Sequence, residues 1–228
     1  MNDVLGRAIF DYHQSNTDTK LWINNKYGEP EEMPVATYFR SEDDMPDLEW
    51  MALEQCRGNV LDIGAGAGSH ALLLQDWKID VTALDISALC ATVMQARGVA
   101  KAIQGDIFEF TQQKFDTLLM LMNGMGLAGT IEGLKELLQH LKTLLKPDGQ
   151  LLFDTSDIAY LYEGNLPKQG YYGEIEYQYS YKNEKTEWFN WLYVDERTLQ
   201  QIATEAGYRM EVLMDDEYGQ YLTRLTLA

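Results

Sequence analysis

The middle of this chain alternates short strand-like runs with longer segments whose apolar residues recur at helical spacing. The strand-like runs are Val60–Ile63, Ile79–Leu84, Ala100–Gln104 and Thr117–Met122. The last of them is almost entirely apolar, as expected for a central strand that is covered on both faces. The segments with helical spacing are 69–77, 87–97 and 131–145. Because helices alternate with strands, the pattern predicts a parallel βα sheet with right-handed crossovers.

The first 57 residues carry a different pattern. Apolar residues recur at helical spacing from Val4 to Tyr12 and predict a short amphipathic helix. Asn24–Met33 is polar and Ser41–Asp47 is acidic, and both contain glycine or proline, so both are predicted to be loops. A second helix is predicted around Leu48–Leu53, before the first strand of the sheet.

Residues 156–194 interrupt the βα repeat. Aromatic and polar residues alternate over Ile175–Tyr181, which is the period-two pattern of a strand. Thr186–Val194 resumes the alternation after a polar turn, so we predict an antiparallel hairpin inserted after a fifth strand at Gln150–Phe153. The chain is predicted to close with a helix capped by Asp195 and with a second antiparallel hairpin made of Tyr208–Met214 and Gln220–Leu227.

Alternating glycines follow directly after the first buried strand, in the sequence VLDIGAGAGSH over Val60–His70. Gly64, Gly66 and Gly68 form the predicted turn, and Ser69 is predicted to cap the next helix. Glycine suits such a turn because it accepts positive φ and allows a ligand close to the main chain. A strand, a glycine turn and a helix in this order predict a ligand at the carboxyl edge of the sheet.

An acid stands at the end of the next predicted strand. Asp85 lies 21 residues after Gly64 (85 − 64 = 21). A carboxylate at this place can accept hydrogen bonds from both hydroxyls of a ribose. The alternative is that Asp85 only caps the helix that begins near Ser87, and the glycine turn upstream favours the ribose.

The spacing of the glycines and the nearby charge decide between two nucleoside ligands. The dinucleotide pattern G-x-G-x-x-G requires glycine where this chain has Ser69. Asp62 stands two residues before the turn, and a carboxylate gains nothing beside an anionic pyrophosphate. S-adenosylmethionine carries an ammonium and a sulfonium and no phosphate. The electrostatics therefore favour S-adenosylmethionine over NAD.

The D-x-G-x-G-x-G turn resembles motif I of the class I S-adenosylmethionine-dependent methyltransferases. Four further motifs of that family are matched in order by Leu84–Ser87, Gly105–Ile107, Lys114–Asp116 and Leu144–Gly149. The resemblance covers residues 58–155 and, more weakly, about the last 35 residues. It implies a three-layer, Rossmann-like α/β fold with a mostly parallel sheet, an antiparallel C-terminal hairpin and an N-terminal helical lid, to which the period-two pattern adds the inserted β-hairpin.

The resemblance also implies two functional segments along the chain. Residues 1–57 would form the helical lid or substrate segment, and residues 58–228 the methyltransferase domain with its insertion at 156–194. Within the lid, Arg40 can bind the carboxylate of the cofactor's methionyl end through two parallel hydrogen bonds. The alternative is a surface ion pair of Arg40 with one of the acids at 42–44.

The resemblance and the lid argument together predict a set of cofactor-binding residues. The set is Arg40, Asp62, Gly64, Ala65, Gly66, Gly68, Asp85, Ile86, Asp106, Ile107, Met122 and Asn123. No catalytic residue is assigned, because a sulfonium is an activated methyl donor and proximity can supply most of the rate enhancement. His13 in the lid is a candidate base, and Asp154 and Asp157, predicted in loops at the sheet edge, are candidate bases or metal ligands. No spacing indicates a metal site.

The charge of the chain bears on the methyl acceptor. The formal net charge is −18, with 36 acids and 18 bases and no dense basic run. This disfavours nucleic-acid substrates, which are bound mainly through Lys and Arg. Asn123–Gly126 also lacks the (N/D)-P-P-(Y/F) element of amino-methylating relatives that act on nucleic acids or protein glutamine.

The chain shows no leader and no apolar run of membrane-spanning length, and its two cysteines suggest no disulfide framework. A cytoplasmic location is therefore expected. We predict a methyltransferase that acts on a small-molecule nucleophile. Two alternatives stay open: an S-adenosylmethionine-binding regulatory protein without catalysis, and an NAD(P)-binding oxidoreductase. Neither the acceptor nor the oligomeric state follows from the residues.

Overall fold

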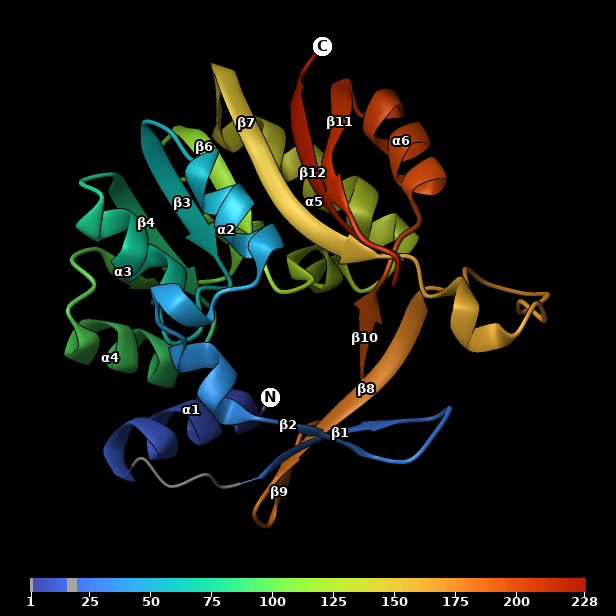
Figure 1. The fold of residues 1–228 in the computed structure, drawn as a ribbon, viewed down its shortest axis with the longest axis horizontal. Coiled ribbons are helices and arrows are strands. Elements are labelled where there is room, and N and C mark those ends of the chain that lie inside the picture. The colour runs from blue at the N-terminus through green and yellow to red at the C-terminus, as the bar shows by residue number, and fades with distance from the viewer. Residues whose placement is uncertain (1, 16–19) are drawn as a thin grey trace. The chain divides into compact units, whose positions relative to one another are not determined.

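The computed structural model describes residues 2–15 and 20–228 (Figure 1). Its α-helices are α1 (Val4–Ser15), α2 (Asp47–Glu54), α3 (Ser69–Asp76), α4 (Ala88–Arg97), α5 (Ile131–Leu144) and α6 (Glu196–Glu205). Its strands are β1 (Leu21–Asn25), β2 (Glu31–Met33), β3 (Asn59–Ile63), β4 (Asp80–Asp85), β5 (Ala102–Gln104), β6 (Phe115–Met120), β7 (Leu145–Ser156), β8 (Glu174–Tyr181), β9 (Glu184–Lys185), β10 (Phe189–Leu192), β11 (Tyr208–Asp215) and β12 (Gln220–Leu227).

The larger of two sheets has the strand order β11-β12-β7-β6-β3-β4-β5. Parallel pairing joins β4 to β5 and β6 to β7. At the other end, β12 pairs antiparallel with both β7 and β11. The predicted α/β class, with a mostly parallel sheet and an antiparallel C-terminal hairpin, is therefore confirmed.

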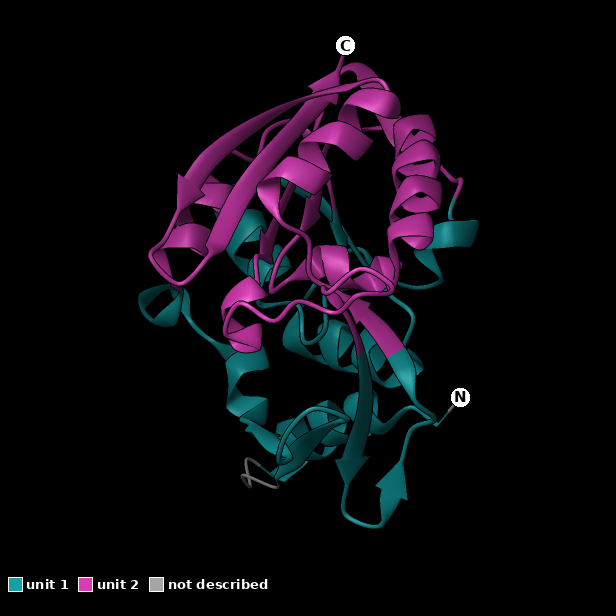
Figure 2. Cartoon of the chain, turned by 90° about the vertical axis from the view of Figure 1, so that its right-hand side faces the viewer, with its two compact units in different colours: residues 1–45, 62–110, 176–189 teal, residues 46–61, 111–175, 190–228 magenta. Residues whose placement is uncertain are grey.

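The chain separates into two compact units that interleave in sequence (Figure 2). Unit 1 consists of Met1–Met45, Asp62–Phe110 and Glu176–Phe189. Unit 2 consists of Pro46–Leu61, Thr111–Ile175 and Asn190–Ala228. The predicted division into a lid (1–57) and a catalytic domain (58–228) is a functional one and stays a prediction.

In unit 1 the predicted N-terminal helix forms α1, which lies beside α4 (Figure 1). Oδ1 of Asp3 accepts a hydrogen bond from the Gly6 amide at 3.0 Å and so satisfies one of the free amides at the start of the helix. The apolar face of α1 buries Val4 and Ile9 in a core cluster with Val93 of α4. Burial of each such side chain stabilises the fold by about 1.5–3 kcal/mol.

The prediction of a loop over Asn24–Met33 is wrong at both ends of this segment, because the end of β1 and the whole of β2 lie there. Leu21 pairs with Met33 on β2 and with Tyr181 on β8, so β1 has an antiparallel neighbour on each side. A partner strand more than 150 residues away overrides the weak local strand preference of β1. The segment predicted as a helical lid therefore contains strands as well as helices.

The second predicted loop, Ser41–Asp47, also contains regular structure. Glu42–Asp44 forms a 3₁₀ turn with Ser41 and Asp44 in a capping box. Here Oγ of Ser41 donates to Oδ2 of Asp44 at 2.7 Å. The capping residues were visible in the sequence, but a single 3₁₀ turn is too short to produce a periodic pattern.

The predicted inserted hairpin is present, and it is part of a sheet. β8 matches the predicted strand, and β10 is the shorter second strand, beside β8 in the sheet β10-β8-β1-β2. The polar turn predicted between them contains β9, which pairs with the end of β8. The aromatic side chains of β8 thus belong to a sheet that includes the N-terminal strands.

In unit 2 the long helix α5 buries its leucine stripe as the spacing predicts. Oγ1 of Thr130 caps α5 by accepting from the Gly133 amide, and Asp195 caps α6 by accepting from Thr198. β7 begins at Leu145 and runs through Pro147, so it starts before the predicted strand at Gln150–Phe153. Within the described residues, no helix has the length and hydropathy required to span a membrane.

Candidate functional site

The predicted glycine turn follows directly after β3 in unit 1. Gly64, Gly66 and Gly68 have φ values of 73°, 56° and 81°, a region that favours glycine. Gly68 itself is the N-cap of α3. The prediction that Ser69 caps this helix is therefore wrong, because the left-handed Gly68 turns the chain into the helix one residue earlier. The Ser69 hydroxyl instead donates to the carbonyl of Tyr38 at 2.8 Å.

The amides of the turn already donate hydrogen bonds within the protein. The amides of Gly64 and Ala65 both donate to the carbonyl of Leu84, at 2.9 and 3.1 Å. The Gly68 amide donates to the carbonyl of Ala65 at 2.8 Å, and the Gly66 amide is bound by a carboxylate described below. A phosphate-binding loop presents free amides to its ligand. This turn presents mainly bare glycine backbone.

Two side chains that the turn's own sequence does not indicate lie against it. A Cβ atom placed on Gly66 would meet the ring of Tyr38 at 3.2 Å, so the ring lies directly against this glycine. Nη1 of Arg97 donates to the carbonyl of Ala67 at 2.7 Å, and the guanidinium lies 4.9 Å from the ring centroid of Phe39. Arg97 thus ties the turn to the segment that the lid prediction covers, and its sequence position gives no sign of this role.

Asp62 lies one residue before the end of β3 and is only 2% exposed. Its burial raises the pKa of the carboxyl to about 6, against the opposing influence of His70 and the Ala71 amide. Oδ2 is buried, and no hydrogen-bond donor among the described residues reaches it. A buried carboxylate oxygen without a partner is costly, and a donor or a positive charge on a ligand would relieve that cost.

Asp85 closes β4 and binds the glycine turn directly. Its Oδ2 accepts the Gly66 amide and its Oδ1 accepts the Ser87 amide, both at 2.8 Å. Burial raises the pKa of Asp85 to about 6, more than these two hydrogen bonds lower it. The N-cap of α4 is Ser87, whose Oγ accepts the Cys90 amide at 3.0 Å. Asp85 therefore does not act merely as the cap of this helix.

The remaining predicted contacts in unit 1 lie on the loops after β4 and β5. The side chain of Ile86, which follows Asp85, is 68% exposed. Asp106 caps a short 3₁₀ helix by accepting the Phe108 amide at 2.9 Å, and Ile107 is buried. The Gly105 amide donates to the Asp85 carbonyl at 2.9 Å, so the two loops are joined.

Arg40 follows the 3₁₀ helix over Val35–Phe39, on the same segment as Tyr38. Desolvation of the half-buried Tyr38 raises the pKa of its phenol, and the charge of Arg40 acts in the opposite direction. The pKa of Asp44 is lowered mainly by hydrogen bonds with Ser41 and, more weakly, by Arg40. Arg40 therefore lies within electrostatic reach of both the Tyr38 phenol and Asp44, one of the acids named as its alternative partners.

Met122 and Asn123 belong to unit 2, where they follow β6. Both have left-handed φ values, 63° and 56°, a conformation that costs a residue other than glycine about 1–2 kcal/mol. The Asn123 amide donates to both carboxylate oxygens of Asp154 at 3.0 Å. Gln220 donates to Oδ2 of Asp154 at 2.9 Å, and Oγ of Ser156 donates to Oδ1 of Asn123 at 3.3 Å. These contacts stabilise the turn.

The description of Asp154 as a candidate base in a loop is wrong, because Asp154 is fully buried inside β7. Burial raises the pKa of Asp154, and its carboxylate oxygens already accept hydrogen bonds from Asn123 and Gln220.

The other two candidate bases also have partners within the protein. Asp157 accepts hydrogen bonds from the Ala159 amide and the Tyr172 hydroxyl, and His13 stacks on Phe39 with ring centroids 6.3 Å apart. Among the residues that the structure describes, no three His, Cys, Asp or Glu side chains are grouped to hold a metal ion.

The group in unit 1 combines a bare glycine turn, an unsatisfied buried carboxylate and a second carboxylate at the next strand end. Carboxylates accept hydrogen bonds from hydroxyls and attract cations, and they repel phosphates. This chemistry fits a nucleoside that carries hydroxyls and a positive charge.

Comparison with known proteins agrees with this chemistry. A family model described as a methyltransferase domain matches residues 38–213. The crystal structure of an S-adenosylmethionine-dependent methyltransferase from Bacteroides fragilis, in complex with S-adenosyl-L-homocysteine, is similar over 99% of this chain and 95% of that chain. The two chains are 39% identical and the TM-score is 0.92.

Two more distant similarities are informative in different ways. An S-adenosylmethionine-dependent methyltransferase from Clostridium acetobutylicum has a similar fold, with a TM-score of 0.61, 14% identity and coverage of 79% of this chain and 88% of that one. A ribosomal RNA small subunit methyltransferase C from Actinobacillus succinogenes is 29% identical over 105 residues. That match covers 42% of this chain and spans only 31% of the ribosomal RNA enzyme.

Proposed function

This chain belongs to the methyltransferase domain family and is a class I S-adenosylmethionine-dependent methyltransferase, and we propose that its methyl acceptor is a small molecule. The observation that carries this proposal is the formal net charge of −18. RNA is bound mainly through basic side chains that neutralise its phosphates, and acids outnumber bases by two to one here.

We propose that unit 1 holds the cofactor through the buried carboxylate of Asp62 and the half-buried carboxylate of Asp85. Each oxygen of Asp85 carries one backbone hydrogen bond and keeps capacity for one ribose hydroxyl. Oδ2 of Asp62 would face the positive end of the cofactor, and the exposed Ile86 would pack on the adenine. Gly64, Ala65, Gly66 and Gly68 would supply the surface on which the cofactor rests, with Asp106 and Ile107 beside the adenine. The bound cofactor supplies an activated methyl group, so the chain has to orient the acceptor and exclude water.

The N-terminal segment is proposed to cover this part of unit 1. The Tyr38 ring lies against Gly66, and Oγ of Ser87 donates to Oδ2 of Asp3 at 2.6 Å. Both contacts join the predicted lid to residues next to the proposed ribose site. Arg40 stays the predicted partner of the cofactor's carboxylate, and Met122 and Asn123 stay predicted contacts from unit 2.

Replacing Asp85 with Ala is expected to weaken S-adenosylmethionine binding at least tenfold, about 1.4 kcal/mol. The variant loses both the proposed ribose contacts and the bond that holds the Gly66 amide. Isothermal titration calorimetry measures the affinity. Asp80→Ala is the matched control, because Asp80 is an exposed acid at the start of the same strand. Wild-type affinity in the Asp85 variant would contradict the ribose assignment.

Cofactor affinity is expected to fall as the pH is lowered from 7.5 to 5. This range extends about 1 unit or more above and below the pKa values of the two carboxyls. The pKa values of Asp62 and Asp85 are raised to about 6 by burial, so both carboxyls become neutral below that pH and lose their attraction for a cation. The loss should approach about tenfold per pH unit for each carboxyl. Calorimetry across this range is the measurement, and a flat profile would be inconsistent with a cofactor held by these acids.

The acceptor class is tested with cofactor carrying a labelled methyl group. The enzyme is incubated in parallel with a panel of small amines, phenols, thiols and carboxylic acids and with ribosomal RNA or ribosomal subunits. The proposal predicts label in a small molecule and none in RNA. Stoichiometric labelling of RNA would overturn the proposed acceptor while leaving the methyltransferase activity in place.

A further inference from the structure

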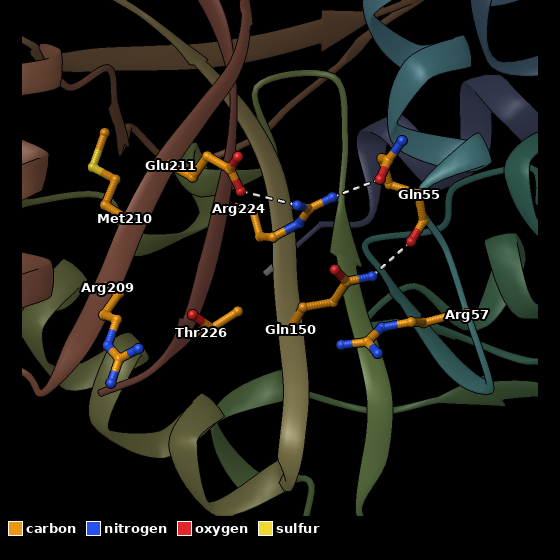
Figure 3. A pocket seen from close by; sticks show the side chains of 8 residues that line it. All are labelled: Gln55, Arg57, Gln150, Arg209, Met210, Glu211, Arg224 and Thr226. Carbon is orange, nitrogen blue, oxygen red and sulfur yellow. Dashed lines mark hydrogen bonds and ion pairs between the residues drawn. The ribbon is translucent and has the colours of Figure 1, made fainter.

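A polar pocket lies within unit 2, on the sheet formed by β7, β12 and β11 (Figure 3). Its volume is about 470 Å³, within the range of small-molecule sites. In the strand register, Arg209 stands opposite Thr226, and Thr226 stands opposite Gln150. Side chains of directly paired residues share one face of a sheet, so this row lies on the face that forms the pocket.

The lining of the pocket is positively charged, although the protein as a whole is acidic. Arg57, Arg209 and Arg224, three of the seven arginines in the chain, line it, and Glu211 is its one acid. The four side chains sum to +2, so the rest of the chain carries a formal charge of −20 (−18 − 2 = −20). A local potential of this sign attracts an anion, and it is opposite in sign to the net charge of the chain.

One of the three arginines is held in place by its neighbours. Nη1 of Arg224 donates to Oε2 of Glu211 at 2.9 Å, and Nη2 donates to Oε1 of Gln55 at 2.6 Å (Figure 3). Nε of Arg224 is buried, and no acceptor among the described residues satisfies it. Nε2 of Gln150 donates to the Gln55 carbonyl at 2.6 Å, so this wall of the pocket is preorganised.

The other two arginines keep most of their hydrogen-bonding capacity. Arg57 donates from Nη2 to the Asp148 carbonyl at 2.8 Å, which leaves further N–H groups of its guanidinium. Arg209 is exposed, and its guanidinium makes no hydrogen bond or ion pair with the part of the chain that the structure describes. A guanidinium binds a carboxylate or a phosphate through two parallel N–H groups.

We propose that this pocket binds a small organic anion, a phosphate ester or a polycarboxylate, between Arg57 and Arg209 beside the fixed Arg224. The site is separate from the end of β7 at which a parallel sheet binds ligands. Gln150 precedes Ser156, at that end, by six residues (156 − 150 = 6), or about 20 Å along the strand. A pocket of this size in a chain of net charge −18 suits a small anion better than a nucleic-acid strand, which needs many basic side chains along its path.

Binding is tested by titrating the full-length protein with pyrophosphate and, separately, with citrate at low ionic strength, followed by NMR or calorimetry. Arg209→Gln is expected to weaken binding about tenfold, the effect of one charge-assisted hydrogen bond. Arg209 is exposed and makes no contact that the fold needs, so the variant should fold normally. Arg197→Gln is the matched control, because Arg197 is an exposed arginine on α6 of the same unit.

Glu211→Gln should act in the opposite direction and strengthen binding, because it removes the one carboxylate of the pocket. Saturable binding of pyrophosphate alone would identify a phosphate site, and binding of citrate alone a carboxylate site, and either result supports the proposal. Absence of saturable binding, or equal affinities of the Arg209 and Arg197 variants, would overturn it. Binding of an RNA oligonucleotide that depends on Arg209, without binding of either small anion, would also overturn it.

Discussion

With Asp62 changed to Asn, S-adenosylmethionine binding is expected to weaken by a factor of about 10–100, the effect of losing a charge-assisted contact in a buried site. The buried Oδ2 has no donor within the described protein, so the ligand would be its partner. The size of the side chain is unchanged, and one oxygen remains to accept the Ala71 amide. The lost affinity therefore reports the charge of Asp62 rather than its shape.

The same variant is expected to retain or gain stability. Burial raises the pKa of Asp62 to about 6, so holding its carboxyl ionised at neutral pH costs the fold up to about 3 kcal/mol. Asn removes this cost, although its amide group introduces a buried donor that offsets part of the gain. Urea denaturation measures the free energy of unfolding, and calorimetry measures the affinity.

Asp76→Asn is the matched control for this substitution, because Asp76 is an exposed acid at the end of α3 in the same unit. It should change neither quantity. Loss of both affinity and stability in the Asp62 variant would indicate a structural role for the carboxylate, and unchanged affinity would contradict its role in the site.

The second large effect is expected at Asp154. Replacement by Ala should lower the free energy of unfolding by about 2–4 kcal/mol, because it leaves the Asn123 amide and the Gln220 side chain without their acceptor in a buried place. The left-handed Met122–Asn123 turn should then relax, which should lower kcat. Urea denaturation and steady-state kinetics measure the two effects.

The Asp154→Asn variant distinguishes the effect of lost hydrogen bonds from the effect of lost side-chain volume. Its side chain keeps its size, and its one carbonyl oxygen can still accept a hydrogen bond from the Asn123 amide. It should lose less stability than the Ala variant. Gln220→Ala removes only the other contact and should leave the turn in place. An Ala variant of Asp154 with wild-type stability and kcat would show that this carboxylate does not hold the turn.

Elements with a strong local signal were predictable from the sequence. The glycine at 98 ends α4 in a left-handed conformation, and Asp195 caps α6, both as their residue types indicate. The leucine stripe of α5 was equally clear. β1 was missed because its pairing with β8 is formed across more than 150 residues, and a five-residue strand with two asparagines has little local preference; β2 pairs with β1 and was missed with it.

The proposed cofactor site was predictable where its residues lie close together in the sequence. Asp62, the glycines of the turn and Asp85 follow two strands that are consecutive in the sequence, and they belong to recognisable sequence motifs. The roles of Arg97 and Asp154 were not predictable, because each acts on backbone about 30 residues away. The arginine pocket was not predictable either, since strand register rather than sequence proximity places Arg209, Thr226 and Gln150 in one row across the sheet.

The most direct test of the account is a crystal structure of this protein with S-adenosyl-L-homocysteine. We predict both ribose hydroxyls within hydrogen-bonding distance of the Asp85 carboxylate and the amino group of the homocysteine next to Asp62, with the nucleoside resting on residues 64–68. A nucleoside bound with its ribose and amino group on other residues, and with Oδ2 of Asp62 still without a partner, would contradict it.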